Sequence, residues 1–395
     1  MSRKKDPATI VAAARTEFDR GYRGVAPPIV ASDTFEWDSP DEKPEFDYSR
    51  TVNPNRALLA QALTELEGAA GAVITNSGQS AALLALLRLP NGAGVVAPHD
   101  CYGGTYRLLQ ALANQGKIAC DFVDFTDGAA FDRALGEKLD LLWIETPSNP
   151  LLRITDITRC AAAAKQRGAL VIADNTLLTP LRQQPLALGC DLVMHSTTKA
   201  LNGHSDLFGG ALLAADAALV EELEWWSNAA GLNGSAFDAS QTLRGLRTLP
   251  LRLDRQESTA GRVAQWLSGR ADVQAVHYPG LESHSGHHVA TQQQSGHGFM
   301  LSFRLRGGKA AADKFVGALE LITLASSLGG FATLICTPAS MTHRGMPAEA
   351  QEEAGIHPDL LRLSVGLEDP DDLIADLERG FAVPADILSL GYNPH

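Results

Sequence analysis

A lysine and an aspartate follow separate apolar runs of the sequence, at positions suited to carbonyl chemistry. Lys199 follows residues 192–194 and a group of small hydroxyl residues, and Asp174 ends the run 170–174. A desolvated lysine amine can form a Schiff base with an aldehyde. A lone lysine is usually a solvated surface residue, and an aspartate at a strand end more often caps a turn. The apolar surroundings of Lys199 favour the chemical role.

These two residues meet the first demands of pyridoxal 5'-phosphate (PLP). This cofactor needs a lysine amine for a Schiff base and a carboxylate that keeps its pyridine nitrogen protonated. It also needs donors for its phosphate and a flat surface for its ring. Lys199 would supply the amine and Asp174 the carboxylate. They lie about one strand-helix-strand step apart in the sequence, so both can reach one cleft.

Other positions offer the phosphate donors and the ring surface. Ser196 and Thr198 present hydroxyl groups beside Lys199, while Gly78 and Gln79 lie where a predicted strand turns into a helix. The first N–H groups of such a helix suit a phosphate. Tyr102 follows another predicted strand and is a candidate for stacking, although a core tyrosine is the commoner outcome. Each signal is weak alone, because hydroxyl residues and glycines at such turns are mostly structural.

Arg362 lies within an alternating segment near the C-terminus, residues 361–364. A buried arginine needs an anionic partner. The carboxylate of an amino-acid substrate would provide one through a bidentate contact. The alternative is the exposed face of an edge strand, and the sequence gives these two interpretations similar weight.

Short apolar runs alternate with helical patterns between residues 61 and 255. The expected strands are 71–75, 95–97, 141–145, 170–174 and 192–195. Continuous apolar strands separated by helices indicate an α/β fold with a mainly parallel sheet covered on both faces. Residues 256–395 mix helices with alternating strands, which predicts a smaller α+β C-terminal domain. Functional groups of open α/β sheets gather beyond the carboxyl ends of strands, where the candidates above lie.

Residues 1–60 show no clear periodic pattern. They contain Pro27-Pro28, an acidic stretch at 38–47, and Asn53-Pro54. A long, weakly periodic arm usually packs on another structure. We therefore expect an N-terminal arm (1–60) that contacts a neighbouring subunit, a PLP-binding domain (61–255) and a C-terminal domain (256–395).

The composition is that of a globular protein with an acidic balance. The chain has 33 Lys and Arg against 46 Asp and Glu, a formal net charge of −13, which argues against a nucleic-acid partner. Its five cysteines form no CxxC pair, so we expect no metal site and reduced thiols, as in the cytoplasm. We recognise neither a signal peptide nor a membrane-spanning run. A cytoplasmic location without membrane or nucleic-acid partners is expected.

The ordered set of motifs resembles the Cys/Met-metabolism family of PLP enzymes, also called the cystathionine γ-synthase family. The resemblance runs from about residue 25 to the C-terminus and is greatest to the bacterial synthase branch. The matching segments are Asp47-Tyr48-Ser49-Arg50, Tyr102-Gly103-Gly104-Thr105-Tyr106, Glu145-Thr146-Pro147-Ser148-Asn149-Pro150, Asp174-Asn175-Thr176, residues 195–206, Ser327-Leu328-Gly329-Gly330 and residues 361–366.

This resemblance implies an aspartate-aminotransferase-like fold (type I) and a homotetramer built from two dimers. In each dimer, Tyr48 and Arg50 would reach across to the PLP phosphate of the neighbour. The other implied roles are phosphate binding by Gly78, Gln79, Ser196 and Thr198, stacking by Tyr102, pairing of Asp174 with the ring nitrogen, substrate carboxylate binding by Asn149 and Arg362, and orientation of Lys199 by Ser327.

Some family positions differ in ways that bear on the reaction. Synthases and many γ-lyases of the family carry a Glu where this chain has Ser326, and that Glu reads the distal or amino group of the substrate. Asp47 and Arg107, which suit a synthase-like substrate site, are present. Methionine γ-lyases typically have Cys at position 104, so Gly104 argues against that branch.

The expected activity is γ-replacement on O-succinyl- or O-acetylhomoserine with cysteine, giving cystathionine for methionine biosynthesis. The expected catalytic residues are Lys199, Asp174 and Tyr102, with Tyr102 assisting proton transfer. One alternative is a cystathionine γ-lyase, which releases cysteine, 2-oxobutanoate and ammonia. Another is a sulfhydrylase that uses free sulfide on a homoserine ester. An alternative of a different class is a non-catalytic binding or assembly protein on this fold, against which the complete set of Lys199, Asp174 and Arg362 argues.

Overall fold

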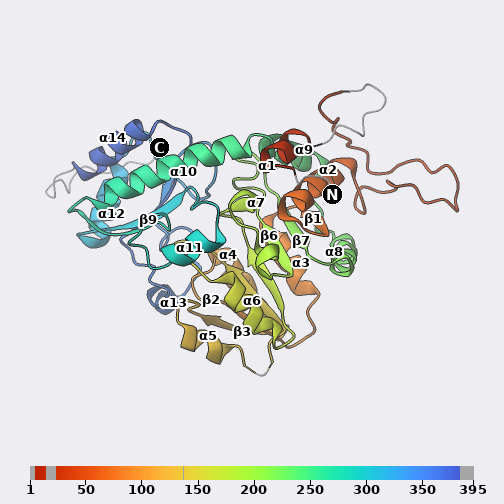
Figure 1. Ribbon diagram of the computed structural model, residues 1–395, viewed down its shortest axis with the longest axis horizontal. Helices are drawn as coiled ribbons and strands as arrows, with labels where there is room; N and C mark the ends of the chain where they lie inside the picture. The colour runs from red at the N-terminus through yellow and green to blue at the C-terminus, as the bar shows by residue number, and fades with distance from the viewer. Residues whose placement is uncertain (1–4, 15–23, 137, 383–395) are drawn as a thin grey trace.

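Two β-sheets organise the chain in the computed structural model, which describes residues 5–14, 24–136 and 138–382. Figure 1 shows the larger sheet with its helices in the orange to green part of the ribbon, and the smaller sheet in the cyan to blue part. The fold is the expected α/β class, with a mainly parallel central sheet and a smaller second unit.

The larger sheet orders its strands β1-β7-β6-β5-β4-β2-β3. Strand β7 runs antiparallel to β1 and β6, and the other neighbouring pairs are parallel. The carboxyl ends of the parallel strands therefore share one edge. The strands are β1 (Gly71–Thr75), β2 (Ala93–Pro98), β3 (Ile118–Val123), β4 (Leu141–Glu145), β5 (Leu170–Asp174), β6 (Leu192–His195) and β7 (Gly210–Ala214).

Helices cover both faces of this sheet, so its central strands are mostly apolar and buried. Trp143 of β4 joins the core cluster formed with α3 and α4, while its neighbours Leu142 and Ile144 join the cluster formed with α5 and α6 on the other face. The helices of this unit are α2 (Pro54–Glu67), α3 (Gly78–Leu87), α4 (Gly103–Asn114), α5 (Gly128–Ala134), α6 (Ile157–Lys165), α7 (Thr179–Arg182), the 3-10 helix η1 (Pro185–Leu188), α8 (Ala217–Ala230) and α9 (Ala236–Leu246).

The smaller sheet orders its strands β10-β11-β12-β9-β8 and is antiparallel except between β10 and β11. Helix α10 (Leu249–Ser268) crosses from the α9 end of the molecule to this sheet (Figure 1). The remaining elements are β8 (Val273–His277), α11 (His287–Gln293), β9 (Met300–Leu305), α12 (Gly308–Gly317), β10 (Thr323–Leu324), β11 (Leu334–Cys336), α13 (Ala348–Glu353), β12 (Leu360–Ser364) and α14 (Pro370–Phe381).

The prediction of an irregular stretch over residues 1–60 is wrong at both ends of the described part. Helix α1 spans Pro7–Ala12, and α2 begins at Pro54, capped by the side chain of Asn53. The Asn-Pro pair was a helix-start signal, since asparagine caps well and proline suits the first helical position. Between these helices, the segment from residue 24 extends from the body of the molecule on the right of Figure 1.

The boundary that we expected near residue 255 falls inside the continuous helix α10. The division into domains at this point stays a prediction. Within the described ranges, no helix combines the length and the apolar character needed to span a membrane.

Candidate active site

A cavity of about 630 Å³ opens at the carboxyl edge of the larger sheet and is closed on its other side by residues of the smaller unit. Helix starts and strand ends of the large unit form one wall, as expected for a doubly covered parallel sheet. The predicted site residues that line the cavity are Gly78, Gln79, Tyr102, Arg107, Asn149, Asp174, Ser196, Thr198, Lys199, Ser326, Ser327 and Arg362.

The amine of Lys199 lies in this cavity, four residues after the end of β6. Its Nζ donates a hydrogen bond to Oγ of Ser327 at 2.9 Å. Burial lowers the pKa of Lys199 to about 8, and the neighbouring Arg362 guanidinium adds to the shift. A substantial neutral fraction near pH 8 makes this amine a nucleophile for a carbonyl compound.

Ser327 reaches Lys199 because two backbone segments approach closely. Ser327 has a φ of 85°, in the left-handed region that costs energy for a residue with a side chain. Two residues later, a Cβ on Gly329 would lie 2.7 Å from the backbone nitrogen of Ala200. Only glycine allows this contact, which brings the loop of the smaller unit against the lysine segment.

Asp174 ends β5 and is 9% exposed. Its Oδ1 accepts the N–H of Thr176 at 3.0 Å, and among the described residues it forms no ion pair. Burial raises the pKa of this carboxyl group. A buried carboxylate without a cationic partner is costly, so the position fits a ligand that brings a positive charge, as a protonated ring nitrogen does.

One corner of the cavity lies where β1 turns into α3. Ser77 caps this helix through a bond from the N–H of Ser80, while Gly78 and Gln79 contribute first-turn N–H groups. A Cβ on Gly78 would lie 2.7 Å from Cβ of Ser196, so glycine keeps this corner open. The hydroxyl of Thr198 also lines the cavity, but it donates to the carbonyl of Gly209. The corner suits a phosphate group.

Tyr102 immediately precedes α4 and lines the cavity. A Cβ on Gly104 would lie 2.5 Å from Cε1 of the Tyr102 ring. The absence of a side chain at Gly104 therefore lets the ring occupy its position. This arrangement offers a flat aromatic surface to a planar ligand.

Arg362 of β12 is 2% exposed, which excludes the edge-strand alternative for this residue. Its Nη1 donates to Oδ1 of Asn149 at 2.9 Å, and its Nη2 donates to the carbonyl of Ser327 at 2.8 Å. Its buried Nε has no hydrogen-bond partner in the described part of the chain. A buried guanidinium without a carboxylate partner fits the carboxylate of a substrate.

Three predicted site residues do not line the cavity of this chain. Asp47, Tyr48 and Arg50 lie on the N-terminal arm, where Asp47 pairs with Lys43 at 3.2 Å and Tyr48 is 42% exposed. Arg50 donates to the backbone and side-chain oxygens of Asn228, at 2.9 and 2.8 Å. Within one chain, the arm and the cavity are thus separate.

Sequence reasoning assigned no role to several residues that line the cavity. Glu145 and Thr176 lie at or just after strand ends, so the rule that found Asp174 could have found them. Met194 lies within β6, and most of the others come from irregular loops without a periodic signal. They include Phe208, Leu328, Met341, Thr342, Arg344 and Gly345.

The cavity therefore combines a lysine amine, an unpaired buried carboxylate, a helix start that suits a phosphate and an aromatic surface, as PLP requires. The fold and the site define a PLP-dependent enzyme of fold type I. A model of the Cys/Met metabolism PLP-dependent enzyme family matches residues 8–382. The chain belongs to this family of trans-sulfuration enzymes, and its cofactor is PLP.

The chain is similar over nearly its whole length to named members of this family. The chain is 48% identical to cystathionine γ-synthase of Escherichia coli K12, over 96% of this chain and 98% of that protein. It is 40% identical to cystathionine γ-lyase of Bacillus subtilis, over 91% and 94%. The cystathionine γ-synthase of Xanthomonas oryzae pv. oryzae, solved in complex with cystathionine, matches with a TM-score of 0.95 and 50% identity, covering 96% and 98%.

Proposed function

We propose that this enzyme catalyses γ-replacement, in which the thiol of cysteine displaces the acyl group of O-succinyl- or O-acetylhomoserine to give cystathionine. The observation that carries the proposal is the buried Arg362 guanidinium, which faces the same cavity as the Lys199 amine and has no carboxylate partner in the described chain. An α-amino acid brings both the carboxylate that Arg362 requires and an amine that can react where Lys199 reacts. Similarity to named synthases supports this choice of amino acid.

The cofactor residues have separate tasks in this proposal. Lys199 would hold the cofactor covalently, Asp174 would pair with its ring nitrogen, and the corner of Gly78, Gln79, Ser196 and Thr198 would bind its phosphate. Tyr102 would offer the surface on which the ring stacks. Bound PLP supplies an electron sink for negative charge that develops on the substrate carbons.

Other residues position the substrate, and Lys199 transfers its protons. Arg362 and Asn149 hold the α-carboxylate, and Ser327 orients the Lys199 amine through their 2.9 Å hydrogen bond. Because the pKa of the Lys199 amine is lowered to about 8, this amine can both accept and return protons at the substrate Cα and Cβ near neutral pH. Arg107 and Ser326 line the cavity and are proposed to contact the distal part of the substrate.

The arm residues require a second copy of the chain in this proposal. Tyr48 and Arg50 would reach the phosphate of a neighbouring subunit, and Asp47 would approach the neighbour's substrate, in a homotetramer built from two dimers. We also propose that the enzyme works in the cytoplasm, where its thiols stay reduced.

A cystathionine γ-lyase is the second candidate, supported by the similarity to a named lyase. Mass spectrometry of products from homoserine esters and from cystathionine, each with and without cysteine, separates the two. Cystathionine formed from an ester and cysteine supports the synthase. Release of 2-oxobutanoate from cystathionine as the main reaction would favour the lyase, and sulfide-dependent homocysteine would favour the sulfhydrylase.

Position 326 gives a further test of the reaction type. We expect Ser326→Glu to change the ratio of replacement to elimination products by several-fold, because it places a carboxylate beside the distal part of the substrate. The ratio of cystathionine to 2-oxobutanoate measures the effect. An unchanged ratio would show that this position does not select the reaction.

A further inference from the structure

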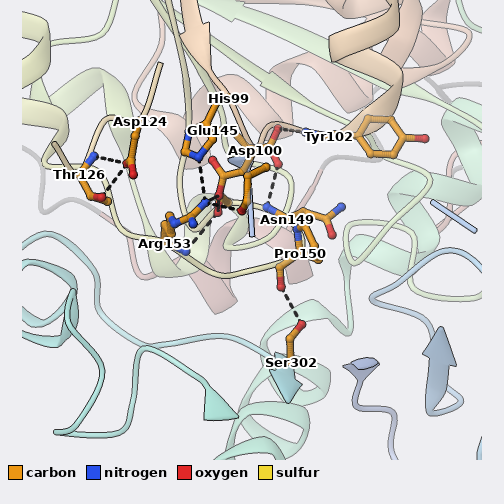
Figure 2. Close-up of polar contacts among 12 residues, drawn as sticks. His99, Asp100, Tyr102, Asp124, Thr126, Glu145, Asn149, Pro150, Arg153 and Ser302 are labelled. Atoms are coloured by element: carbon orange, nitrogen blue, oxygen red, sulfur yellow. Dashed lines mark hydrogen bonds and ion pairs between the residues drawn. The ribbon is translucent and has the colours of Figure 1, made fainter. Parts of the chain in front are cut away.

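Glu145 is a buried carboxylate in the cavity wall to which the proposed reaction assigns no task. It ends β4 and is 5% exposed. Its Oε2 accepts the backbone N–H of Tyr102 at 2.8 Å, and its Oε1 accepts the backbone N–H of Asn149 at 3.1 Å. Figure 2 shows the side chain of Glu145 between these two residues. Each carboxylate oxygen therefore binds a different segment of the chain.

The two segments carry groups for different parts of the site. Tyr102 precedes α4 and makes no side-chain cap bond of its own, while its ring lines the cavity. Asn149 lies in the loop after β4, and its side chain accepts from Arg362. Glu145 thus joins the segment that supplies the ring surface to the segment that supplies the carboxylate-binding group.

The electrostatic setting makes this placement costly unless the carboxylate has a task. Glu145 is directly paired with Asp174 across β4 and β5, so two acidic side chains lie on neighbouring strands at the cavity edge. Burial raises the pKa of Glu145 well above its usual range, and the charge of Asp174 adds to the rise. Two N–H donors favour the ionised form, and a cation beside Asp174 would reduce the repulsion between the two acids.

We propose that Glu145 is a positioning residue that fixes the Tyr102 ring and the Asn149 side chain relative to each other through its two backbone contacts. The inference rests on the proposed function for the tasks of Tyr102 and Asn149. It concerns geometry, because Glu145 acts through the two residues that meet the cofactor and substrate.

The substitution Glu145→Gln tests this role with little change of shape. An amide offers one carbonyl oxygen, so one of the two N–H groups loses its acceptor and faces an NH₂ group instead. We expect kcat/KM to fall about 10- to 100-fold, the factor that a hydrogen bond to a charged group represents, with a rise in KM. We also expect a change in the visible circular dichroism of bound PLP, because the ring surface shifts.

The matched control is Asp140→Asn, immediately before the opposite end of the same strand. Asp140 also accepts a backbone N–H, that of Gly94 at 2.8 Å, but it does not line the cavity. The amide of this variant keeps one oxygen for the single N–H of Gly94, so the variant should leave KM and the circular dichroism of PLP unchanged. Equal kinetic and spectral effects of the two variants would overturn the proposal.

Glu145→Asp provides a second test, and it carries the test alone if Glu145→Gln does not fold. It keeps the charge but is one methylene shorter, so it cannot reach both N–H groups. A rise in KM with an altered PLP spectrum supports positioning, whereas wild-type values would overturn it. All kinetics use the substrate that the wild-type enzyme converts, by replacement or elimination, and the spectrum needs no substrate. A wrong reaction assignment would therefore leave this inference testable.

Discussion

Predicted PLP residues lie in two regions, the N-terminal arm and the cavity wall at the carboxyl edge of the larger sheet, here called the floor. Within a single chain, only the residues of the floor come together in the cavity. On the floor, Asp174 is the last residue of β5 and Lys199 lies four residues after the neighbouring strand β6, and both line one cavity. On the arm, Tyr48 is 42% exposed and Arg50 binds Asn228 rather than a cavity residue. The floor is built by the sheet, whereas the arm has no element that brings it to the site.

This difference separates two ways of completing an active site. Parallel strands place their carboxyl ends at one edge, so residues far apart in the sequence meet without further help. In the proposed homotetramer, another copy of the chain supplies the cavity that the arm reaches. Floor substitutions should therefore affect chemistry at any protein concentration, and arm substitutions should act through assembly and cofactor affinity.

Lys199→Ala should give the largest loss. Removal of the amine eliminates both the covalent attachment of PLP and the proton transfers, so turnover should fall by at least about 10³-fold while the fold is retained. Steady-state product formation with added PLP measures the loss, and far-ultraviolet circular dichroism checks the fold. Retained turnover would contradict the assignment of Lys199.

Asp174→Asn should give the second-largest loss. Its kcat should fall about 10²- to 10³-fold, the usual loss when a preorganised electrostatic group is removed. The neutral amide no longer holds a positive charge on the ring nitrogen. Asp191→Asn is a matched control, since Asp191 accepts the N–H of Val171 at 2.9 Å near the other end of β5. Similar kcat values for the two variants would show that Asp174 has only a structural task.

Arg50→Ala tests the arm side of the comparison. If Arg50 binds a phosphate of the neighbouring subunit, its loss should weaken PLP binding about 10-fold or more, with a smaller change in kcat at saturating PLP. Titration of the apoprotein with PLP gives the affinity. Arg262→Ala, an exposed arginine of α10, is the control and should keep wild-type affinity. An unchanged PLP affinity of Arg50→Ala in the assembled oligomer would show that the arm does not bind the phosphate of a neighbouring subunit.

A smaller effect is expected on how the rate of the reaction between Lys199 and PLP depends on pH. Burial and Arg362 lower the pKa of Lys199 to about 8, so its neutral, nucleophilic form accumulates as the pH rises through 8. The rate of covalent reconstitution from apoprotein and PLP should therefore rise up to about pH 8 and then level off. Stopped-flow absorbance measures this rate. A rate that continues to rise towards pH 10.5 would indicate an exposed lysine instead.

The sequence predicted the floor well because its signals are local. Each candidate on the floor follows a short apolar strand, and the order of strands and helices already places such ends together. Strand β7 was not predicted, since Gly210–Ala214 is short and rich in small residues with little β preference. The start of α2 at Pro54 was a readable signal within the arm.

The remaining parts of the site depend on contacts that residue types do not reveal. Met341 and Arg344 come from a loop without periodicity, and tertiary packing alone brings them to the cavity. The position of Glu145 was visible at the end of its strand, but its two backbone partners were not. Arg362 could not be distinguished from an edge-strand residue until its burial was known.

The most direct test of the account is to identify the residue that carries the cofactor. The holoenzyme is reduced with borohydride and digested, and the peptides are examined by mass spectrometry, with Lys199→Ala treated in parallel. The account predicts the PLP adduct on Lys199 in the wild-type protein and none on that peptide in the variant. An adduct on a different lysine, or no stable adduct in PLP-loaded wild-type protein, would contradict it.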